Sequence, residues 1–115
     1  MIFIGYKKCS TCKRISKQMD EKNISYKYRE IDKENPSREE LESWYQKSGL
    51  DIKKFFNTSG KVYRENNLKD KLKTMDLDEK LDLLSKDGML VKRPILLDGD
   101  KIFVGNQVEK YIESF

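Results

Sequence analysis

The 115-residue sequence contains no histidine and only two cysteines, Cys9 and Cys12. Without histidine, the chain lacks both the commonest general base and a common metal ligand. A structural zinc site needs about four ligands, so the two cysteines would require carboxylates or a second chain to complete one. The pair could instead form a structural disulfide, serve as small apolar core residues, or act as a reactive pair.

Long hydrophobic runs are also absent. The apolar N-terminal run, Met1–Ile4, is too short for an export signal or a membrane span, so we expect a cytoplasmic protein with no membrane contact. The 24 basic and 20 acidic side chains are mixed along the chain, and no basic stripe predicts direct nucleic-acid binding. The length predicts one domain, residues 1–115, with a modest core.

The two cysteines lie in the stretch Lys8–Arg14, which reads KCSTCKR. It follows a predicted strand and enters a predicted helix, Ser10–Lys22. Unpaired N–H groups and the positive end of the helix dipole stabilise a thiolate at a helix start, and the nearby lysines add positive charge. We therefore predict a lowered pKa for Cys9, which makes it the nucleophile. Cys12, one turn later, would attack a mixed disulfide on Cys9.

The hydrophobic pattern divides the chain into three parts. Residues 1–35 predict a β-α-β unit, with apolar residues 2–4 and the alternating stretch 24–31 as parallel strands. Residues 36–88 predict helices only. Residues 89–115 predict two strands around an Asp98–Asp100 turn, and then a helix that buries Val108, Tyr111, Ile112 and Phe115. The prediction is an α/β fold, βαβ then ββα, with an inserted helical block.

Within the helical block, Ser37 with Glu40 and Asp76 with Glu79 have the spacing of capping boxes, so each predicts a helix start. A single weakly amphipathic helix is predicted over residues 61–73. The helix after Asp76 is predicted to turn three residues inward: Leu77, Leu81 and Leu84.

Three motifs in this order resemble the arsenate reductase (ArsC/Spx) family: CSTCKR at residues 9–14, NTSGKVYR at 57–64 and KRPIL at 92–96. The resemblance covers the whole chain. It implies a thioredoxin/glutaredoxin-like fold with a mixed four-stranded sheet, and it implies that Cys9 is the reactive cysteine. Arg93 would lie beside Cys9 and stabilise negative charge, and Pro94 would follow a cis peptide bond.

The function implied is thiol-disulfide oxidoreduction on a small disulfide or an oxyanion. No bound cofactor is expected, and glutathione, another cellular thiol or a thioredoxin-type protein would be the reductant. The catalytic residues implied are Cys9, Cys12 and Arg93. The substrate-binding residues implied are Ser10, Thr11, Asn57 and Pro94.

The same resemblance supports an alternative function. Spx members share the Cys-x-x-Cys and Arg-Pro motifs, and they are transcriptional regulators that bind the α subunit of RNA polymerase. In such a protein the disulfide would be a redox switch. Relative to the arsenate-reducing members, this chain has Asn57 and Gly105 in place of arginines and Gly5 in place of a histidine, so Arg93 alone remains of that arginine set.

Overall fold

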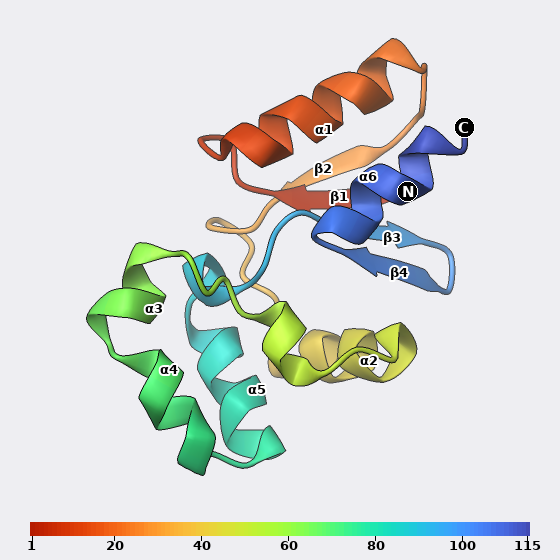
Figure 1. Cartoon of the computed structure of the whole chain (residues 1–115). Helices are drawn as coiled ribbons and strands as arrows, with labels where there is room; N and C mark the ends of the chain where they lie inside the picture. Colours follow the sequence, from red (N-terminus) through yellow and green to blue (C-terminus); the bar gives the residue numbers. More distant parts are fainter.

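A computed structural model describes all 115 residues, and a four-stranded mixed sheet lies at its centre (Figure 1). The strands are β1 (Ile2–Gly5), β2 (Lys27–Glu30), β3 (Ile95–Asp98) and β4 (Lys101–Val104). Their order across the sheet is β2-β1-β3-β4. β1 and β2 are parallel and are joined by α1 (Ser10–Glu21), whereas β3 is antiparallel to both β1 and β4. The predicted fold class, βαβ then ββα around a mixed sheet, is confirmed.

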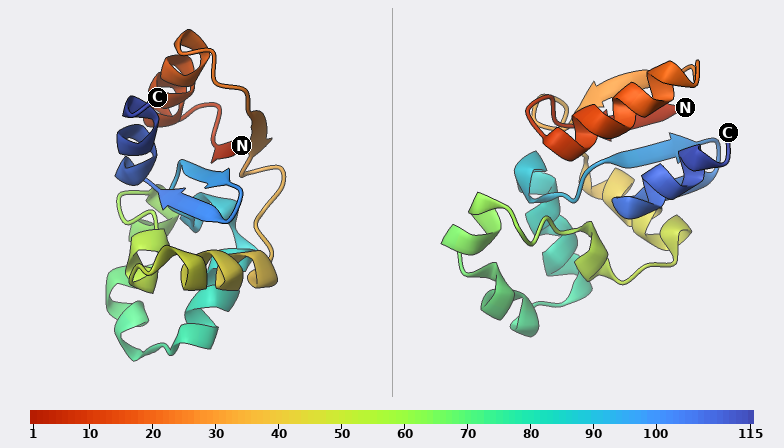
Figure 2. Two further views of the ribbon diagram at one scale, coloured as in Figure 1. Left: turned by 90° about the vertical axis from the view of Figure 1, so that its right-hand side faces the viewer. Right: turned by 45° about the horizontal axis from the view of Figure 1, so that its top comes forward.

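The two faces of the sheet are covered by different parts of the chain. α1 and α6 (Asn106–Glu113) lie on one face, and the helical block lies on the other (Figures 1 and 2). The helices of the block are α2 (Arg38–Ser48), α3 (Lys61–Glu65), α4 (Leu68–Lys71) and α5 (Leu77–Lys86). Because strand side chains alternate, Phe3 packs toward α1 and α6 while Ile4 packs toward the block.

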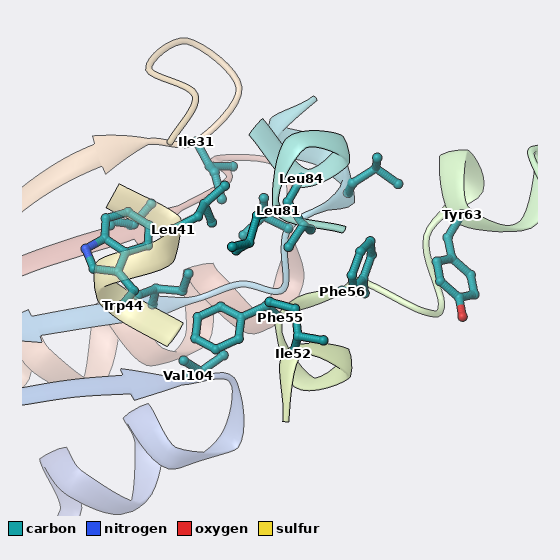
Figure 3. Packing of buried hydrophobic residues seen from close by; sticks show 14 of the residues in the cluster. Ile31, Leu41, Trp44, Ile52, Phe55, Phe56, Tyr63, Leu81, Leu84 and Val104 are labelled. Carbon is teal, nitrogen blue, oxygen red and sulfur yellow. The ribbon is translucent and has the colours of Figure 1, made fainter. Parts of the chain in front are cut away.

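Two separate hydrophobic clusters result. The larger, which we call the block core, has 17 buried residues between the sheet and the helical block, and Figure 3 shows Phe55, Phe56, Leu81 and Leu84 meeting there. The smaller, which we call the α1/α6 core, has seven buried residues. They are Phe3, Cys12, Ile15, Met19, Leu96, Val108 and Ile112.

The helix boundaries follow the predicted local chemistry. Ser37 and Asp76 each cap a helix through a complete capping box, and Gly49 ends α2 in the left-handed conformation at φ +66°. A short 3₁₀ helix, η1 (Ile52–Phe55), follows α2. None of the helices combines the length and apolarity needed to cross a membrane.

The structure differs from the sequence predictions in one helix of the block, in two residues that were expected in the core and in the length of one strand. The helix predicted over residues 61–73 is broken into α3, α4 and a 3₁₀ turn, because Asn67 adopts the left-handed conformation at φ +53°. Leu77 is 40% exposed at the start of α5, and Phe115 is 54% exposed beyond α6, so neither is a core residue. The strand predicted at 24–31 is only β2, although Ile24 and Tyr26 still pack on the α1/α6 core.

Candidate active site

Cys9 is the residue immediately before α1, so the first N–H groups of the helix surround its sulfur. Its backbone is extended, and its carbonyl accepts the first helical hydrogen bond from Lys13 N at 3.0 Å. The backbone N–H groups of Thr11 and Cys12 and the side chain of Cys12 lie near the Cys9 sulfur and lower its pKa, although no side-chain cap hydrogen bond is formed. A serine or aspartate oxygen commonly accepts such bonds at this position. The Cys9 sulfur lies at this position but forms no such cap hydrogen bond.

The pKa of Cys9 lies below its ordinary value. Burial acts against this, because it disfavours the charged thiolate. The hydrogen bonds from Cys12, the positive charge of Arg93 and the N–H of Thr11 lower the pKa and together outweigh burial. The predicted lowering is therefore confirmed, although the helix start and Arg93 supply it more than the lysines of the motif do.

Cys12 differs sharply from Cys9. It is fully buried in the α1/α6 core, and burial is the largest cause that raises its pKa to about 12. The N–H of Tyr6 acts in the opposite direction by donating to the Cys12 sulfur, but the neighbouring Cys9 thiolate raises the pKa further. Both cysteines are free thiols in this structure. Cys12 thus keeps its proton to a higher pH than an ordinary thiol.

Arg93 is a half-buried cation that takes part in no ion pair. Its guanidinium carbon lies 5.1 Å from the centre of the Tyr6 ring, and its Nη1 donates to the carbonyl of Met89 at 3.4 Å. Its Nε is buried without a hydrogen-bond partner. Because no carboxylate neutralises it, its charge acts on the nearby cysteines.

A cavity of about 260 Å³ opens beside Cys9. It is lined by Cys9, Thr11, Asn57, Ser59, Gly60, Lys92, Arg93, Gly105 and Asn106. We call it the Cys9 cavity. Its walls come from the start of α1, the loop before α3, the segment before β3 and the start of α6, so four distant stretches of the chain meet there.

Backbone pairing holds the loop after η1 against the segment that carries Arg93. Phe56 and Val91 form an isolated antiparallel bridge. On either side of it, Asn57 N donates to Leu90 O and Lys92 N donates to Phe55 O, each at 2.7 Å. These bonds place Asn57 across the Cys9 cavity from the helix start. The turn itself is tight, because a Cβ on Gly60 would lie 2.6 Å from the Asn57 side-chain nitrogen.

The structure brings together four of the residues proposed from the sequence: Cys9, Thr11, Asn57 and Arg93 line one cavity, and Cys12 lies directly behind Cys9. Two others do not line it. Ser10 is exposed at the first position of α1. Pro94 is buried after a cis peptide bond, as expected, and its carbonyl accepts a hydrogen bond from Gly105 N at 2.8 Å.

Sequence reasoning missed Tyr6, which contacts Arg93 through its ring and Cys12 through its N–H. It also missed Lys92 and Asn106 as cavity residues, whereas the family resemblance already placed Gly105 at the position of an arginine of the arsenate-reducing members. Lys92 adjoins the Arg-Pro pair and could have been found from that position. Nothing local in the sequence marks Tyr6 or Asn106, because only the packing of β1 and α6 brings them to the site.

The arrangement can bind and polarise an anion and can form a bond to sulfur. Backbone N–H groups and the guanidinium of Arg93, which has no ion-pair partner, lie around a sulfur whose pKa is lowered, and a second thiol lies next to it. No group of three or more His, Cys, Asp or Glu side chains is arranged to hold a metal ion.

Comparison with known sequences gives one family. The sequence model of the ArsC family matches residues 4–114. YusI of Bacillus subtilis is 48% identical over 115 residues, which are all of this chain and 98% of that protein. The regulatory protein MgsR of Bacillus subtilis is 28% identical over 91% of this chain and 82% of its own length. A global transcriptional regulator Spx of Listeria monocytogenes is 26% identical over 84% of this chain and 72% of its own.

Solved structures give the same result. An ArsC family related protein of Bacteroides fragilis superposes with a TM-score of 0.91 at 45% identity, over 97% of this chain and 94% of that one. A protein of Streptococcus mutans described as a possible arsenate reductase superposes with a TM-score of 0.88 at 43% identity, over 99% and 97% of the two chains. The likeness in fold extends over nearly the whole length of each.

Proposed function

This chain belongs to the ArsC family, and on that premise we propose that it is a thiol-disulfide oxidoreductase that uses Cys9 and Cys12 in turn. The single observation that carries the proposal is the pairing of Cys9, whose pKa is lowered, with the buried Cys12, whose pKa is raised, at a cavity that contains an arginine without an ion-pair partner. The thiolate is the attacking form of cysteine, so the lowered pKa makes Cys9 the more reactive of the two.

The first step is attack of the Cys9 thiolate on one sulfur of a disulfide, R–S–S–R. A Cys9–S–S–R bond forms, the R–S–S–R bond breaks, and one R–S⁻ leaves and takes a proton from solvent. Arg93, whose charge already favours the Cys9 thiolate, would also favour the negative charge that passes to the leaving sulfur. Thr11 and Asn57 would contact the substrate from the cavity wall.

The second step depends on the coupling between the two cysteines. The Cys9 thiolate raises the pKa of Cys12, and this contribution disappears once Cys9 is part of a neutral mixed disulfide. Cys12 then loses its proton more easily and attacks the Cys9 sulfur. A Cys9–Cys12 disulfide forms and the second R–S⁻ leaves, so the substrate gains two electrons and the protein loses two. Glutathione, another cellular thiol or a thioredoxin-type protein would then reduce the pair.

Two single variants test this proposal. Purified reduced protein is mixed with hydroxyethyl disulfide and analysed by intact-mass spectrometry. We expect Cys12→Ser to accumulate one mixed disulfide on Cys9, because no second thiol can resolve it. We expect Cys9→Ser to form no adduct on this timescale, because Cys12 is buried and protonated. The unsubstituted protein should lose two mass units without a stable adduct.

Opposite outcomes would overturn the proposal. Adduct formation on Cys12 in the Cys9→Ser variant at the rate of the unsubstituted protein would show that Cys9 is not the nucleophile. Equal alkylation rates for Cys9 and a small model thiol at pH 7 would show that Cys9 is not activated.

A second candidate function, a redox-sensing transcriptional regulator, is favoured by the relatives named MgsR and Spx. In that function the Cys9–Cys12 disulfide would change binding to the α subunit of RNA polymerase. A pull-down with the isolated C-terminal domain of that subunit discriminates between the two. Binding that changes with redox state, together with no turnover of disulfides, would favour the regulator. Turnover without binding would favour the enzyme.

A further inference from the structure

Gly5 ends β1 beside the buried thiol of Cys12, and its lack of a side chain leaves room there. A Cβ at Gly5 would lie 2.8 Å from the hydroxyl oxygen of Tyr28 and 3.2 Å from the sulfur of Cys12. The hydroxyl and the sulfur therefore lie around one small space that any larger residue would fill. Tyr28 is thus a near neighbour of the second cysteine, although it does not line the Cys9 cavity.

The sheet and two neighbouring side chains hold the Tyr28 ring in place. Tyr28 on β2 is paired with Phe3 on β1, and the centres of their rings are 5.2 Å apart. The ammonium of Lys7 lies 4.2 Å from the centre of the Tyr28 ring. Phe3 and Cys12 both belong to the α1/α6 core, and the partly buried Tyr28 packs against that core. Packing, and not a hydrogen bond, therefore sets the position of the hydroxyl.

The Tyr28 hydroxyl is an unused hydrogen-bond donor. It takes part in no hydrogen bond with the rest of the chain, whereas the hydroxyl of Tyr26 donates to Asp20 Oδ1 at 2.8 Å. Burial raises the pKa of Tyr28 above its ordinary value, and the charges of Cys12 and Cys9 raise it further. The hydroxyl therefore keeps its proton when Cys12 loses its own, so it can donate a hydrogen bond to a thiolate but does not act as a base.

We propose that the Tyr28 hydroxyl donates a hydrogen bond to the Cys12 thiolate while Cys12 resolves the mixed disulfide on Cys9. This inference rests on the proposed function. A buried thiolate is costly without a hydrogen-bond donor or a positive charge beside it. The N–H of Tyr6 already acts on the Cys12 sulfur, and Tyr28 would add a second donor that the neutral thiol does not use. A hydrogen bond made only to the charged form lowers the barrier of the step in which that charge appears.

Atoms and electrons balance in this step without a further reactant. Cys12 gives its proton to water, and its thiolate attacks the sulfur of Cys9. The Cys9–Cys12 bond forms, the bond between Cys9 and the R sulfur breaks, and R–S⁻ leaves and takes up a proton. Tyr28 is neither oxidised nor deprotonated. The same hydrogen bond would serve the return reaction, because Cys12 is the leaving thiolate when an external thiol attacks Cys9 of the disulfide.

The test separates the two steps of the reaction at pH 7. Reduced protein is mixed with excess hydroxyethyl disulfide, quenched with acid at set times and analysed by intact-mass spectrometry. The Cys12→Ser background gives the rate constant for formation of the mixed disulfide, and the chain with both cysteines gives the rate constant for its resolution. The variant is Tyr28→Phe, which removes only the hydroxyl. The control is Tyr26→Phe, the same change on a tyrosine that packs against the same core but bonds to Asp20.

We expect Tyr28→Phe to slow resolution roughly tenfold, because a hydrogen bond to a charged sulfur is lost. Formation of the mixed disulfide should stay within about twofold of the parent. Reduction of the Cys9–Cys12 disulfide by dithiothreitol should slow by a factor similar to that for resolution. The reduction potential in glutathione buffers at pH 7 should not change, because Cys12 is a neutral thiol in the reduced protein. Tyr26→Phe should match the parent in every measurement.

Resolution at the parent's rate in Tyr28→Phe would overturn the inference. Equal slowing in Tyr26→Phe, or an equal loss in formation of the mixed disulfide, would also overturn it, because either result would indicate a loosened core. A parent protein that forms no mixed disulfide on Cys9, or forms one and never resolves it, would overturn the proposed function and the inference with it. The two failures are therefore distinguishable.

Discussion

The two cores of this molecule differ in what they contain besides apolar side chains. The block core has 17 buried residues, none of which is a cysteine. The α1/α6 core has seven, and one of them is Cys12. Burial in that small core is the main reason that the Cys12 thiol stays protonated. The larger core therefore supports the fold, and the smaller core also controls the protonation of a reactive group.

The candidate site lies where the two regions meet. Cys9 and Thr11 come from the sheet and α1, whereas Asn57, Ser59 and Gly60 come from the helical block. The bridge between Phe56 and Val91 joins the two. Substitutions in the block core and in the α1/α6 core should therefore affect the two cysteines differently.

The largest expected effect is on stability, in the block core. Leu81 is 1% exposed and Leu77, one turn earlier on α5, is 40% exposed. We expect Leu81→Ala to lower the free energy of unfolding by about 2–5 kcal/mol and Leu77→Ala by less than about 1 kcal/mol. Urea unfolding followed by circular dichroism measures both. The alkylation rate of Cys9 in the folded variants should be unchanged. Similar losses of unfolding free energy in the two variants would contradict the prediction that only Leu81 belongs to the core.

A substitution in the α1/α6 core should also change the reactivity of Cys12. Ile15 is 1% exposed and belongs to the same cluster as Cys12. We expect Ile15→Ala to lower the free energy of unfolding by about 2–5 kcal/mol and also to speed the alkylation of Cys12, because the cavity left behind exposes the thiol. The Cys9→Ser background isolates Cys12 in this measurement. The matched control is Leu81→Ala on that background, and faster labelling there as well would indicate general loosening.

Removing the charge beside the site should change the pKa of Cys9. Arg93 lowers that pKa by its charge, so Arg93→Gln should move it upward and slow the alkylation of Cys9 at pH 7 several-fold. The pH profile of iodoacetamide alkylation, measured on the Cys12→Ser background, reports the shift. Arg38→Gln removes an arginine of the block that pairs with Asp78, and its profile should match the parent. An unchanged pH profile for Arg93→Gln would show that the charge of Arg93 does not lower the pKa of Cys9.

The buried thiol should make reduced protein less stable in mild alkali. Unfolded Cys12 ionises near its ordinary pKa of about 8.5, whereas folded Cys12 keeps its proton up to a pKa of about 12. The unfolded state thus binds fewer protons, and stability falls as pH rises above about 8.5, by at most about 1.4 kcal/mol per pH unit. Cys12→Ala should remove this slope between pH 8.5 and 9.5. Cys9 adds a slope of opposite sign there, which fades as unfolded Cys9 ionises, because its folded pKa is lowered. Cys9→Ser is therefore the background for both measurements.

The smallest effect is expected at a helix cap of the block, far from both cysteines. Ser37 Oγ accepts from Glu40 N at 3.1 Å within a capping box. Ser37→Ala should lower the free energy of unfolding by about 1 kcal/mol. Ser85→Ala on α5, where the hydroxyl only bonds back to the Asp82 carbonyl, should change it by less than about 0.5 kcal/mol. Equal changes would show that the cap contributes nothing beyond an ordinary surface hydroxyl.

Local chemistry in the sequence predicts the features that depend on few neighbours. The capping boxes and the lowered pKa of Cys9 appear where expected, and so does the cis bond before Pro94, which the family resemblance implied. The break at Asn67 and the exposure of Leu77 and Phe115 were missed. Periodicity marks which face of a helix is apolar, but it does not say where the core ends or whether an asparagine takes up a left-handed turn.

The order of elements, the two-cysteine motif at a helix start and the Arg-Pro pair were all determined by the sequence alone, because each depends on residues adjacent along the chain. Only the tertiary structure decided that Arg93 packs on the Tyr6 ring and bonds to Met89 O, that Cys12 is sealed in the α1/α6 core, and that Ser59, Gly60 and Asn106 line the same cavity as Cys9. The physical reason is that these contacts join stretches tens of residues apart, and they exist only after the helical block packs on the sheet and the Phe56–Val91 bridge closes.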